Sequence, residues 1–346
     1  MKALLLVGGK GTRLRPLTNR IPKPMVPIMG RPLLERTLKM LKQHNTGEIV
    51  LSTCYKPECI RSYFGDGSKL GLNIHYVRES VPLGTGGAIK NSEQYFDDPF
   101  FVLNADILSD INYGEMMQFH KQKKADVTIA VTRVENPSAY GVIEYDSDGY
   151  ATSFREKPKT ISSHFINAGV YVFEPHVLKE IPAGRPVSVE REVFPKLLEK
   201  GMKIAVYQGC DYWIDIGTPA KYIQANLDAF SGKLRLPENR LGGHVAQSGP
   251  GISKGATFRG PVYVGKNVRI GDEAVVGPYV ILGDNCAVGT GCEIANSLFW
   301  NNILIGSGTT MTDCIVTDDC RINGPSRCRR LICTPDSVEG VESAAV

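Results

Sequence analysis

A six-residue repeat in the C-terminal part of the chain constrains the fold most strongly. One bulky apolar residue stands at every sixth position from 252 to 300, and glycine follows five of them. The repeated positions are Ile252, Phe258, Val264, Ile270, Val276, Leu282, Val288, Ile294 and Trp300. In a parallel β-helix each short strand turns one apolar residue inward, and small residues occupy the turns. The repeat therefore predicts a β-helix domain over residues 251–346.

The cysteines follow the same spacing. Cys286 and Cys292 are six residues apart, as are Cys314 and Cys320. None of the nine cysteines forms the Cys-x-x-Cys pair that is typical of structural zinc sites. We interpret these four as small residues stacked in the coil, with thiols kept reduced in the cytoplasm.

Residues 1–230 follow a different pattern, in which strand-like apolar runs alternate with helix-like segments. Strands are expected at 3–7, 49–53, 74–77, 100–104 and 127–131, and helices at 33–43 and 115–123. This alternation predicts an α/β domain with a mainly parallel sheet covered by helices on both faces. Ligands of such sheets bind beyond the carboxyl ends of the strands. Residues 231–250, rich in turn formers, are expected to be a linker.

Composition excludes several classes of protein. A net charge of +4, from 40 basic and 36 acidic residues, is too small to indicate a nucleic-acid partner. The chain has no apolar run of membrane-spanning length, and the apolar run before Gly8 is shorter than that of a signal peptide. We expect a cytoplasmic protein with neither nucleic acid nor membrane as a partner.

The first predicted strand leads into "LLLVGGKGTRLRPLTNRIPKPM", residues 4–25. This stretch holds three glycines followed by four cationic side chains, namely Arg13, Arg15, Arg20 and Lys23. Its spacing fits neither a P-loop nor the dinucleotide fingerprint, which needs a glycine where this chain has Leu14. Backbone N–H groups of a glycine turn can still bind an anion, and the cations would add to that attraction. The alternative is a solvated basic loop.

The stretch "GGKGTRLRPLTNRIPKPMVPI", residues 8–28, closely resembles the signature of the sugar nucleotidyltransferases, which join a nucleoside triphosphate to a sugar 1-phosphate. The resemblance implies a Rossmann-like sheet of the nucleotide-diphospho-sugar transferase type, followed by a left-handed β-helix. It also implies that Lys23 contacts phosphate, and it leaves Arg15 and Arg20 open between phosphate contacts, subunit contacts and solvent. The implied nucleotide-binding residues are Leu6, Gly8, Gly9, Gly11, Thr12 and Arg13.

Further motifs of the family occur in order. "PLGTGGAIKN" resembles the stretch that packs against the nucleobase, which implies Gly84, Thr85 and Gly86 as base-side residues, although it could also be only a glycine-rich helix start. Asp106 ends "FFVLNAD" and Asp215 lies in "YWIDIG". Magnesium prefers one or two carboxylates together with substrate phosphates. The resemblance implies that this pair holds Mg²⁺, whereas either residue alone could be a cap or turn aspartate.

The sugar phosphate is implied to bind at three more motifs. "AYGVIE" supplies Gly141, "FREKPK" supplies Glu156 and Lys157, and "FINAGVYVF" supplies Asn167. Lys157 would neutralise the 1-phosphate, and the side chains of Glu156 and Asn167 would bind sugar hydroxyls. Glu190 in "SVEREVF" is either a further sugar-side residue or a solvent-facing helix residue.

The implied reaction needs no enzyme nucleophile. The ionised oxygen of the sugar 1-phosphate attacks the α-phosphorus in line and pyrophosphate leaves, so catalysis consists of positioning and charge neutralisation. The implied catalytic residues are Arg13, Lys23, Asp106, Lys157 and Asp215.

The motifs look most like those of mannose-1-phosphate guanylyltransferases, which make GDP-mannose from GTP and mannose 1-phosphate. A glucose-1-phosphate thymidylyl- or uridylyltransferase is the alternative. A non-catalytic regulatory homologue would be expected to lose one of the charged residues Arg13, Lys23, Asp106 and Asp215, and all four are present. Hexapeptide β-helices also occur in acetyltransferases, but those need a histidine in the coil, and His244 in the linker is the last histidine of the chain. We expect the β-helix to serve homo-oligomer assembly or regulation.

Overall fold

The computed structural model describes residues 1–234, 236 and 251–341 and contains two compact units that interleave along the chain. The first unit consists of Met1–Lys10, Pro22–Met25 and Leu34–Asp215. The second consists of Gly11–Ile21, Val26–Leu33 and Ile216–Val346. Most of the predicted linker 231–250, including His244, lies outside the described residues, and the predicted domain boundaries at 230 and 251 stay a prediction.

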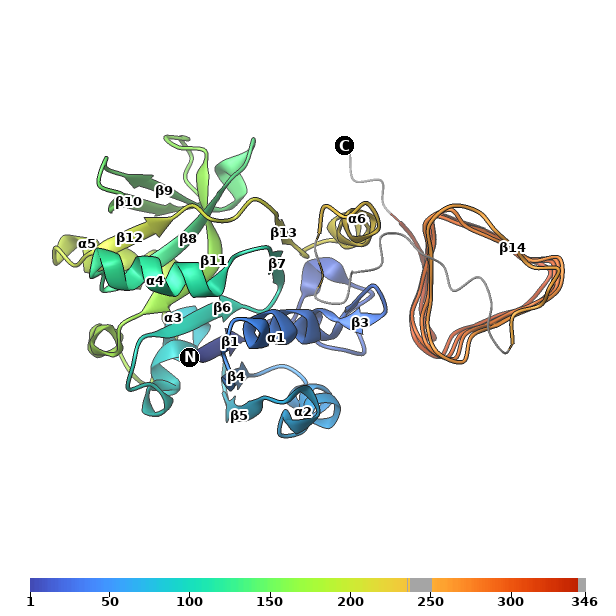
Figure 1. The fold of residues 1–346 in the computed structure, drawn as a ribbon, viewed down its shortest axis with the longest axis horizontal. Helices are drawn as coiled ribbons and strands as arrows, with labels where there is room; N and C mark the ends of the chain where they lie inside the picture. Colours follow the sequence, from blue (N-terminus) through green and yellow to red (C-terminus); the bar gives the residue numbers. More distant parts are fainter. Residues whose placement is uncertain (235, 237–250, 342–346) are drawn as a thin grey trace. The chain divides into compact units, whose positions relative to one another are not determined.

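A mixed sheet forms the centre of the first unit (Figure 1). Its main path runs β10-β9-β11-β6-β1-β4-β5, with β8 paired to β11 and β12 paired to β8. Strands β6, β1, β4 and β5 are parallel, and β11 reverses the direction beside β6. The strands are β1 (Lys2–Leu6), β4 (Glu48–Thr53), β5 (Asn73–Arg78), β6 (Phe100–Asn104), β8 (Val127–Arg133), β9 (Gly141–Tyr145), β10 (Ala151–Glu156), β11 (Phe165–Phe173) and β12 (Ile204–Tyr207). The five predicted strands are confirmed within one or two residues.

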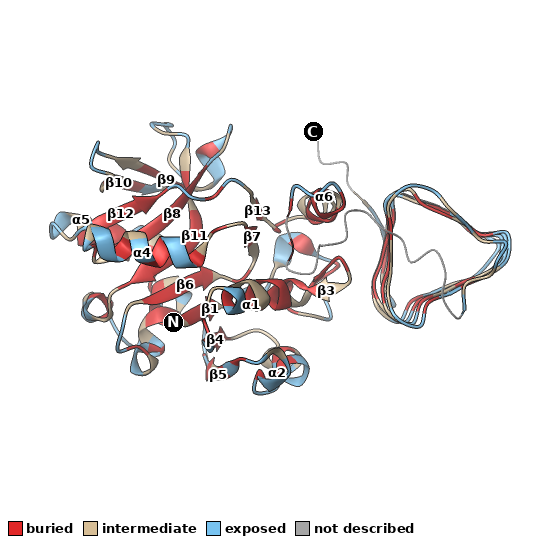
Figure 2. Ribbon diagram, in the orientation of Figure 1, coloured by how far each residue is buried: buried red, intermediate tan, exposed pale blue. Residues whose placement is uncertain are grey.

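Helices cover both faces of this sheet because successive side chains of a strand point to opposite sides. Ala3 and Leu5 of β1 pack in one core with helices α1, α2 and α4, whereas Leu4 packs in the other core with α3 and α5. β1 and its neighbour β6 are buried over most of their length (Figure 2). The helices are α1 (Leu33–Gln43), α2 (Pro57–Phe64), α3 (Gly84–Asn91), α4 (Tyr113–Lys123) and α5 (Phe194–Glu199). The two predicted helices are confirmed, α4 beginning two residues earlier than expected.

Shorter elements complete the first unit. A two-stranded sheet pairs β7 with β13, and a π-helix precedes α5. Their bounds are β7 (Ile107–Ser109), β13 (Trp213–Asp215) and η7 (Val189–Val193), with 3₁₀ turns η2 (Lys23–Met25), η3 (Ser68–Leu70), η4 (Glu93–Tyr95), η5 (Pro137–Ala139) and η6 (Pro175–Glu180).

The second unit contains the predicted left-handed parallel β-helix, whose triangular coils stack on one another in Figure 1. Three sheets form its sides, in the orders β14-β17-β20-β23-β26, β15-β18-β21-β24-β27-β28 and β16-β19-β22-β25. Every pairing is parallel except that of β28 with β27, which ends the coil in a hairpin. The strands are β14 (Thr257–Phe258), β15 (Val262–Val264), β16 (Arg269–Ile270), β17 (Val275–Val276), β18 (Val280–Leu282), β19 (Ala287–Val288), β20 (Glu293–Ala295), β21 (Leu298–Phe299), β22 (Leu304–Ile305), β23 (Thr310–Thr312), β24 (Ile315–Val316), β25 (Arg321–Ile322), β26 (Arg327–Arg329), β27 (Leu331–Cys333) and β28 (Val338–Gly340).

The repeat changes at its ninth predicted position. Val264 pairs with Leu282 at a step of 18 residues, but Leu282 pairs with Phe299 at a step of 17. Phe299 therefore takes the inward place that the six-residue spacing assigned to Trp300. The Trp300 side chain is nevertheless buried, and its Nε1–H donates to the Tyr222 hydroxyl of α6 (Pro219–Phe230) at 2.9 Å. One residue is lost from a corner of this coil, a change that periodicity in the apolar residues alone did not reveal.

The four cysteines of the repeat are buried free thiols. The Cys286 thiol donates to the Trp300 carbonyl at 3.1 Å, and the Cys292 thiol donates to the Gly306 carbonyl at 3.2 Å. Burial raises the pKa of Cys286 to about 11 and also raises the pKa of Cys314 and Cys320. These thiols pack as small side chains within the coil, as the spacing predicted.

The second unit also includes α6 (Pro219–Phe230), the 3₁₀ turn η1 (Thr12–Leu14) and the short strands β2 (Pro27–Ile28) and β3 (Arg31–Pro32). A buried hydrogen bond joins the turn between β2 and β3 to α6. The Met29 N–H between β2 and β3 donates to Asn226 Oδ1 at 2.9 Å. Among the described residues, no helix is long and apolar enough to cross a membrane.

Candidate active site

A pocket of about 360 Å³ opens at the carboxyl edge of the parallel strands in the first unit. The ends of β1, β4, β5 and β6 and the start of α3 supply its walls, as the strand–helix alternation predicted. Seven predicted site residues line it, namely Leu6, Gly8, Gly9, Lys23, Gly84, Thr85 and Asp106. Residues from three separate motifs of the sequence therefore meet in one cavity.

Lys23 is the charged centre of this pocket. Its Nζ lies 2.5 Å from Asp106 Oδ2 and 3.2 Å from Asp215 Oδ1, and only 8% of its side chain is exposed. The β7–β13 ladder explains this geometry, since Asp215 pairs directly with Ile107, the residue after Asp106. Two carboxylates 109 residues apart in the chain thus converge on one cation.

The glycines near the pocket differ in how much space a side chain would have at their positions. A Cβ on Gly8 would lie 3.3 Å from Cys54 Cβ, whereas one on Gly9 would meet nothing within 4 Å. Gly84 has a φ of +69°, and its Cβ would lie 2.6 Å from the Val187 carbonyl oxygen. Gly86 is buried and its N–H donates to that same oxygen at 2.8 Å. Gly86 therefore supports the start of α3 and is not among the residues that line the pocket.

The remaining nucleotide-side residues of the signature belong to the second unit. Gly11 adopts a left-handed conformation with φ 61° and begins the 3₁₀ turn that contains Thr12 and Arg13. The Thr18 hydroxyl donates to the Gly11 carbonyl at 2.8 Å, which closes the turn. Thr12 and Arg13 are exposed, and their predicted contacts with the nucleotide stay predictions.

The sugar-side motifs gather on β9, β10 and β11. Gly141 pairs with Glu156 across the β9–β10 ladder, and a Cβ on Gly141 would lie 2.9 Å from Glu156 Oε2. The missing side chain of Gly141 thus makes room for this carboxylate and for the Phe154 ring, which would lie 2.7 Å from such a Cβ. Asn167 Nδ2 donates to the Tyr171 hydroxyl at 2.7 Å and its Oδ1 accepts from the Gly169 N–H at 2.8 Å. Lys157 is exposed, and its Nζ lies 3.7 Å from Glu156 Oε1.

Glu190 lies in the π-helix and is not a solvent-facing residue of a regular helix. Its Oε2 accepts hydrogen bonds from the hydroxyls of Thr85 and Ser188, both at 2.8 Å. Thr85 Oγ1 in turn accepts from the Val189 N–H at 2.9 Å. Glu190 therefore binds Thr85 at the start of α3 and also raises the pKa of Glu156, the carboxylate predicted to bind the sugar.

Burial raises the pKa of the Glu156 carboxyl, and the Glu190 carboxylate raises it further, while Lys157 and Arg191 lower it. If ionised Glu156 accepts sugar hydroxyls, the KM for sugar 1-phosphate should rise about tenfold per pH unit below that raised pKa. Glu190→Gln removes one negative charge and should shift this rise to lower pH. Steady-state kinetics across the acidic range would measure it.

The control for this prediction is Glu192→Gln, because the Glu192 carboxylate is held by Arg185 and the Ser188 N–H. An identical pH profile for Glu190→Gln and the unchanged chain would contradict the coupling. Loss of binding at acid pH can be separated from unfolding. A carboxyl whose native pKa is raised contributes stability below its unfolded pKa and loses it as pH rises through the native pKa, so Glu156 does not itself promote acid unfolding.

Sequence reasoning missed Glu79, a buried carboxylate that lines the same pocket as Lys23 and Asp106. Its Oε1 accepts from the Ser52 hydroxyl and its Oε2 accepts from the Leu83 N–H, both at 2.8 Å. Glu79 directly follows β5, just as Asp106 follows the end of β6 closely. A polar residue after a buried strand was the signal that could have identified it.

Comparison with known proteins gives two family matches that together cover most of the chain. Residues 2–231 match the model described as nucleotidyl transferase, and residues 258–344 match the GMPPB C-terminal domain. A mannose-1-phosphate guanylyltransferase of Mycobacterium tuberculosis is 43% identical over 273 residues, which cover 78% of this chain and 76% of the relative. A UTP–glucose-1-phosphate uridylyltransferase of Synechocystis is 34% identical over 337 residues, covering 91% and 87%.

A solved structure supports the same similarity. HddC from Yersinia pseudotuberculosis, complexed with GMP-PN, superposes with a TM-score of 0.57 at 30% identity. The match covers 66% of this chain and 99% of that one. The likeness thus concerns about two thirds of the present chain.

Proposed function

Because the chain belongs to the nucleotidyl transferase family, we propose that it transfers GMP from GTP to mannose 1-phosphate, giving GDP-mannose and pyrophosphate. The observation that supports this most strongly is the buried Lys23 between Asp106 and Asp215 in the wall of the pocket. A reaction between two anions needs fixed positive charge more than it needs a base or a nucleophile. Lys23 contributes one such charge at a position largely shielded from water, where it is balanced by Asp106 and Asp215 until substrate phosphates or a metal ion bind.

Each residue then has a defined task. The glycine turn at Gly8 and Gly9 lets the nucleotide approach the backbone closely. The Lys23 ammonium neutralises charge that develops as the α-phosphorus exchanges its bond to pyrophosphate for one to the sugar phosphate. Lys157 neutralises the incoming 1-phosphate, and Glu156 and Asn167 orient the sugar through its hydroxyls.

The same carboxylates fit a magnesium ion. Asp106 and Asp215 already direct one oxygen each at a shared cation, the Lys23 ammonium. Mg²⁺ is commonly bound by one or two carboxylates plus substrate phosphates, and this pair supplies that number. When bound, the ion would supply further neutralisation of the phosphates. Asp106 and Asp215 are the residues that would hold it.

Glu79 supports guanine as the base. Each carboxylate oxygen of Glu79 accepts one hydrogen bond within the protein, and a carboxylate has about four acceptor sites in all. Two adjacent N–H groups, as guanine presents on one edge, match the acceptors that remain, whereas uracil and thymine present a single N–H between two carbonyls. The M. tuberculosis relative and the GMP-PN complex of HddC agree with this choice, and the Synechocystis relative keeps uridylyl transfer as the alternative.

Glu79→Gln should therefore lower kcat/KM for GTP by about 10- to 100-fold, the range expected for loss of a hydrogen bond to a charged group. The value for UTP should change much less, so the ratio of the two values is the decisive readout. A general loss of folding lowers both rates together and leaves that ratio unchanged. A GTP to UTP ratio like that of the unchanged chain would rule out Glu79 as the base-selecting residue.

The proposed activity is tested by pyrophosphate release from each combination of GTP, UTP, dTTP, ATP and CTP with mannose, glucose and glucosamine 1-phosphates. We expect the highest kcat/KM for GTP with mannose 1-phosphate. Release with no pair would instead favour a non-catalytic binding protein. We also propose, from the solenoid architecture alone, that the β-helix forms the contacts of a homo-oligomer.

A further inference from the structure

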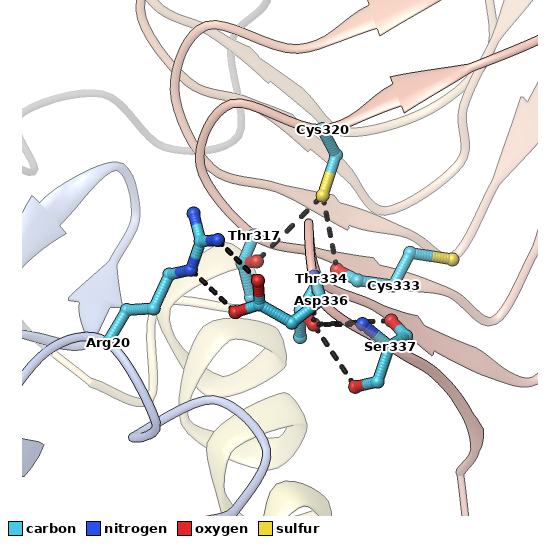
Figure 3. Close-up of polar contacts among 7 residues, drawn as sticks. All are labelled: Arg20, Thr317, Cys320, Cys333, Thr334, Asp336 and Ser337. Carbon is cyan, nitrogen blue, oxygen red and sulfur yellow. Dashed lines mark hydrogen bonds and ion pairs between the residues drawn. The ribbon is translucent and has the colours of Figure 1, made fainter.

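Arg20, whose role the sequence left open, contacts the far end of the β-helix within the second unit. Its Nε–H and Nη2–H donate to the two carboxylate oxygens of Asp336 at 2.7 and 2.6 Å (Figure 3). This two-point pairing fixes orientation as well as distance, because both the guanidinium and the carboxylate are planar. Arg20 and Asp336 are 316 residues apart in sequence.

Asp336 is held in place by the turn that ends the β-helix. The Thr334 hydroxyl oxygen accepts from the N–H groups of Asp336 and Ser337, at 3.2 and 2.9 Å. The Thr334 N–H donates to the Ser337 carbonyl at 2.8 Å, which closes the hairpin between β27 and β28. The carboxylate that receives Arg20 is therefore presented on an ordered turn (Figure 3).

A ladder of side-chain amides leads to the same place. Asn267 donates to Asn285, Asn285 to Asn302, and Asn302 to Asp319, at 3.0 to 3.1 Å. The Asp319 side chain has no N–H group, so it cannot donate to a further residue of the ladder. Asp336 follows Asp319 by 17 residues, the same step as from Asn302 to Asp319. Asp319 and Asp336 line one small hollow of about 140 Å³ together with Arg20. Arg20 thus supplies the donors and the positive charge at the point where the ladder ends in carboxylates.

The segment that contains Arg20 is the signature loop, Gly11–Ile21, which also contains Arg13. Its two ends continue into Lys10 and Pro22 of the first unit, next to the pocket residues Gly9 and Lys23. From this connectivity we propose that Arg20 and Asp336 are positioning residues that anchor the signature loop for binding of the nucleoside triphosphate. The proposal rests on the proposed function for its kinetic consequence, but the anchoring itself does not.

Amide hydrogen exchange of the full chain without substrate tests the anchoring directly. Arg20→Ala and Asp336→Ala should each speed exchange in peptides that cover residues 11–21. The swapped double variant, Arg20→Asp with Asp336→Arg, re-forms the pair and should return exchange toward that of the unchanged chain. Lys200→Ala, which breaks an exposed ion pair with Glu180 in the first unit, is the control and should leave these peptides unchanged.

The kinetic test uses the nucleotide that the unchanged chain prefers. Each single variant should raise KM for that nucleotide roughly two- to fivefold, the size expected for loss of one exposed ion pair, with kcat changed less. The swapped double variant should restore KM. Unchanged exchange over residues 11–21, unchanged KM, or a swapped variant as impaired as the single ones would each overturn the proposal. Failure of the proposed function would show in the unchanged chain and would leave the exchange result intact.

Discussion

Lys23→Ala is expected to lower kcat about 100- to 1,000-fold, the loss seen when one preorganised group that stabilises transition-state charge is removed. Only 8% of the Lys23 side chain is exposed, and Lys23 lines the pocket proposed to bind the nucleotide. Its electrostatic effect is therefore less screened than that of a surface lysine. Single-turnover measurement of pyrophosphate release separates this chemical step from substrate binding.

The variant should also respond differently to magnesium. Without the lysine, Asp106 and Asp215 keep their positions on the β7–β13 ladder but lose the shared cation. Mg²⁺ alone should then raise the thermal midpoint of Lys23→Ala more than that of the unchanged chain. Lys2→Ala is the control, because Lys2 pairs with Asp97 away from the pocket. Near-normal kcat in a folded Lys23→Ala variant would show that the ammonium is not part of catalysis.

Asp106→Asn is expected to raise the Mg²⁺ concentration needed for half-maximal activity by about tenfold or more, an effect that even outer-shell partners of metal ligands produce. Asparagine keeps the shape of the side chain but removes the charge that attracts a hard cation. The same substitution weakens the contact with Lys23, so kcat should fall as well. A magnesium titration at saturating substrates measures the shift.

Asp110→Asn provides a matched control four residues further along the chain. Asp110 Oδ1 accepts from the Tyr212 N–H at 2.9 Å and is absent from the pocket wall. This substitution should lower stability without moving the magnesium midpoint. A midpoint for Asp106→Asn that matches the control would contradict the assignment of Asp106 as a metal ligand.

Much of this fold follows from local patterns in the sequence. Apolar runs identified β1, β4, β5, β6 and β8, because buried parallel strands need continuous apolar residues. The six-residue repeat identified the β-helix for a similar reason, since every coil places the same kind of residue inward. The convergence of Asp106 and Asp215 was expected from the family resemblance, and the β7–β13 register now supplies its physical cause.

Other features depend on packing that no local pattern records. The change from 18 to 17 residues per coil leaves the apolar spacing intact as far as Trp300. It is visible in the strand register, first in the pairing of Leu282 with Phe299 and again in that of Val288 with Ile305. The contact between Arg20 and Asp336 joins residues near opposite ends of the chain. The position of Glu79 after β5 is a local signal, but the contacts with Ser52 and Leu83 that hold its carboxylate at the pocket depend on packing.

The most direct test of the central claim is a competition assay on the full chain with Mg²⁺. Equal concentrations of GTP, UTP and dTTP would be mixed with equal concentrations of mannose and glucose 1-phosphates, and the sugar nucleotides formed would be identified by mass spectrometry. We predict GDP-mannose as the main product, formed together with an equal amount of pyrophosphate. UDP-glucose or dTDP-glucose as the main product would contradict the proposed guanylyl transfer.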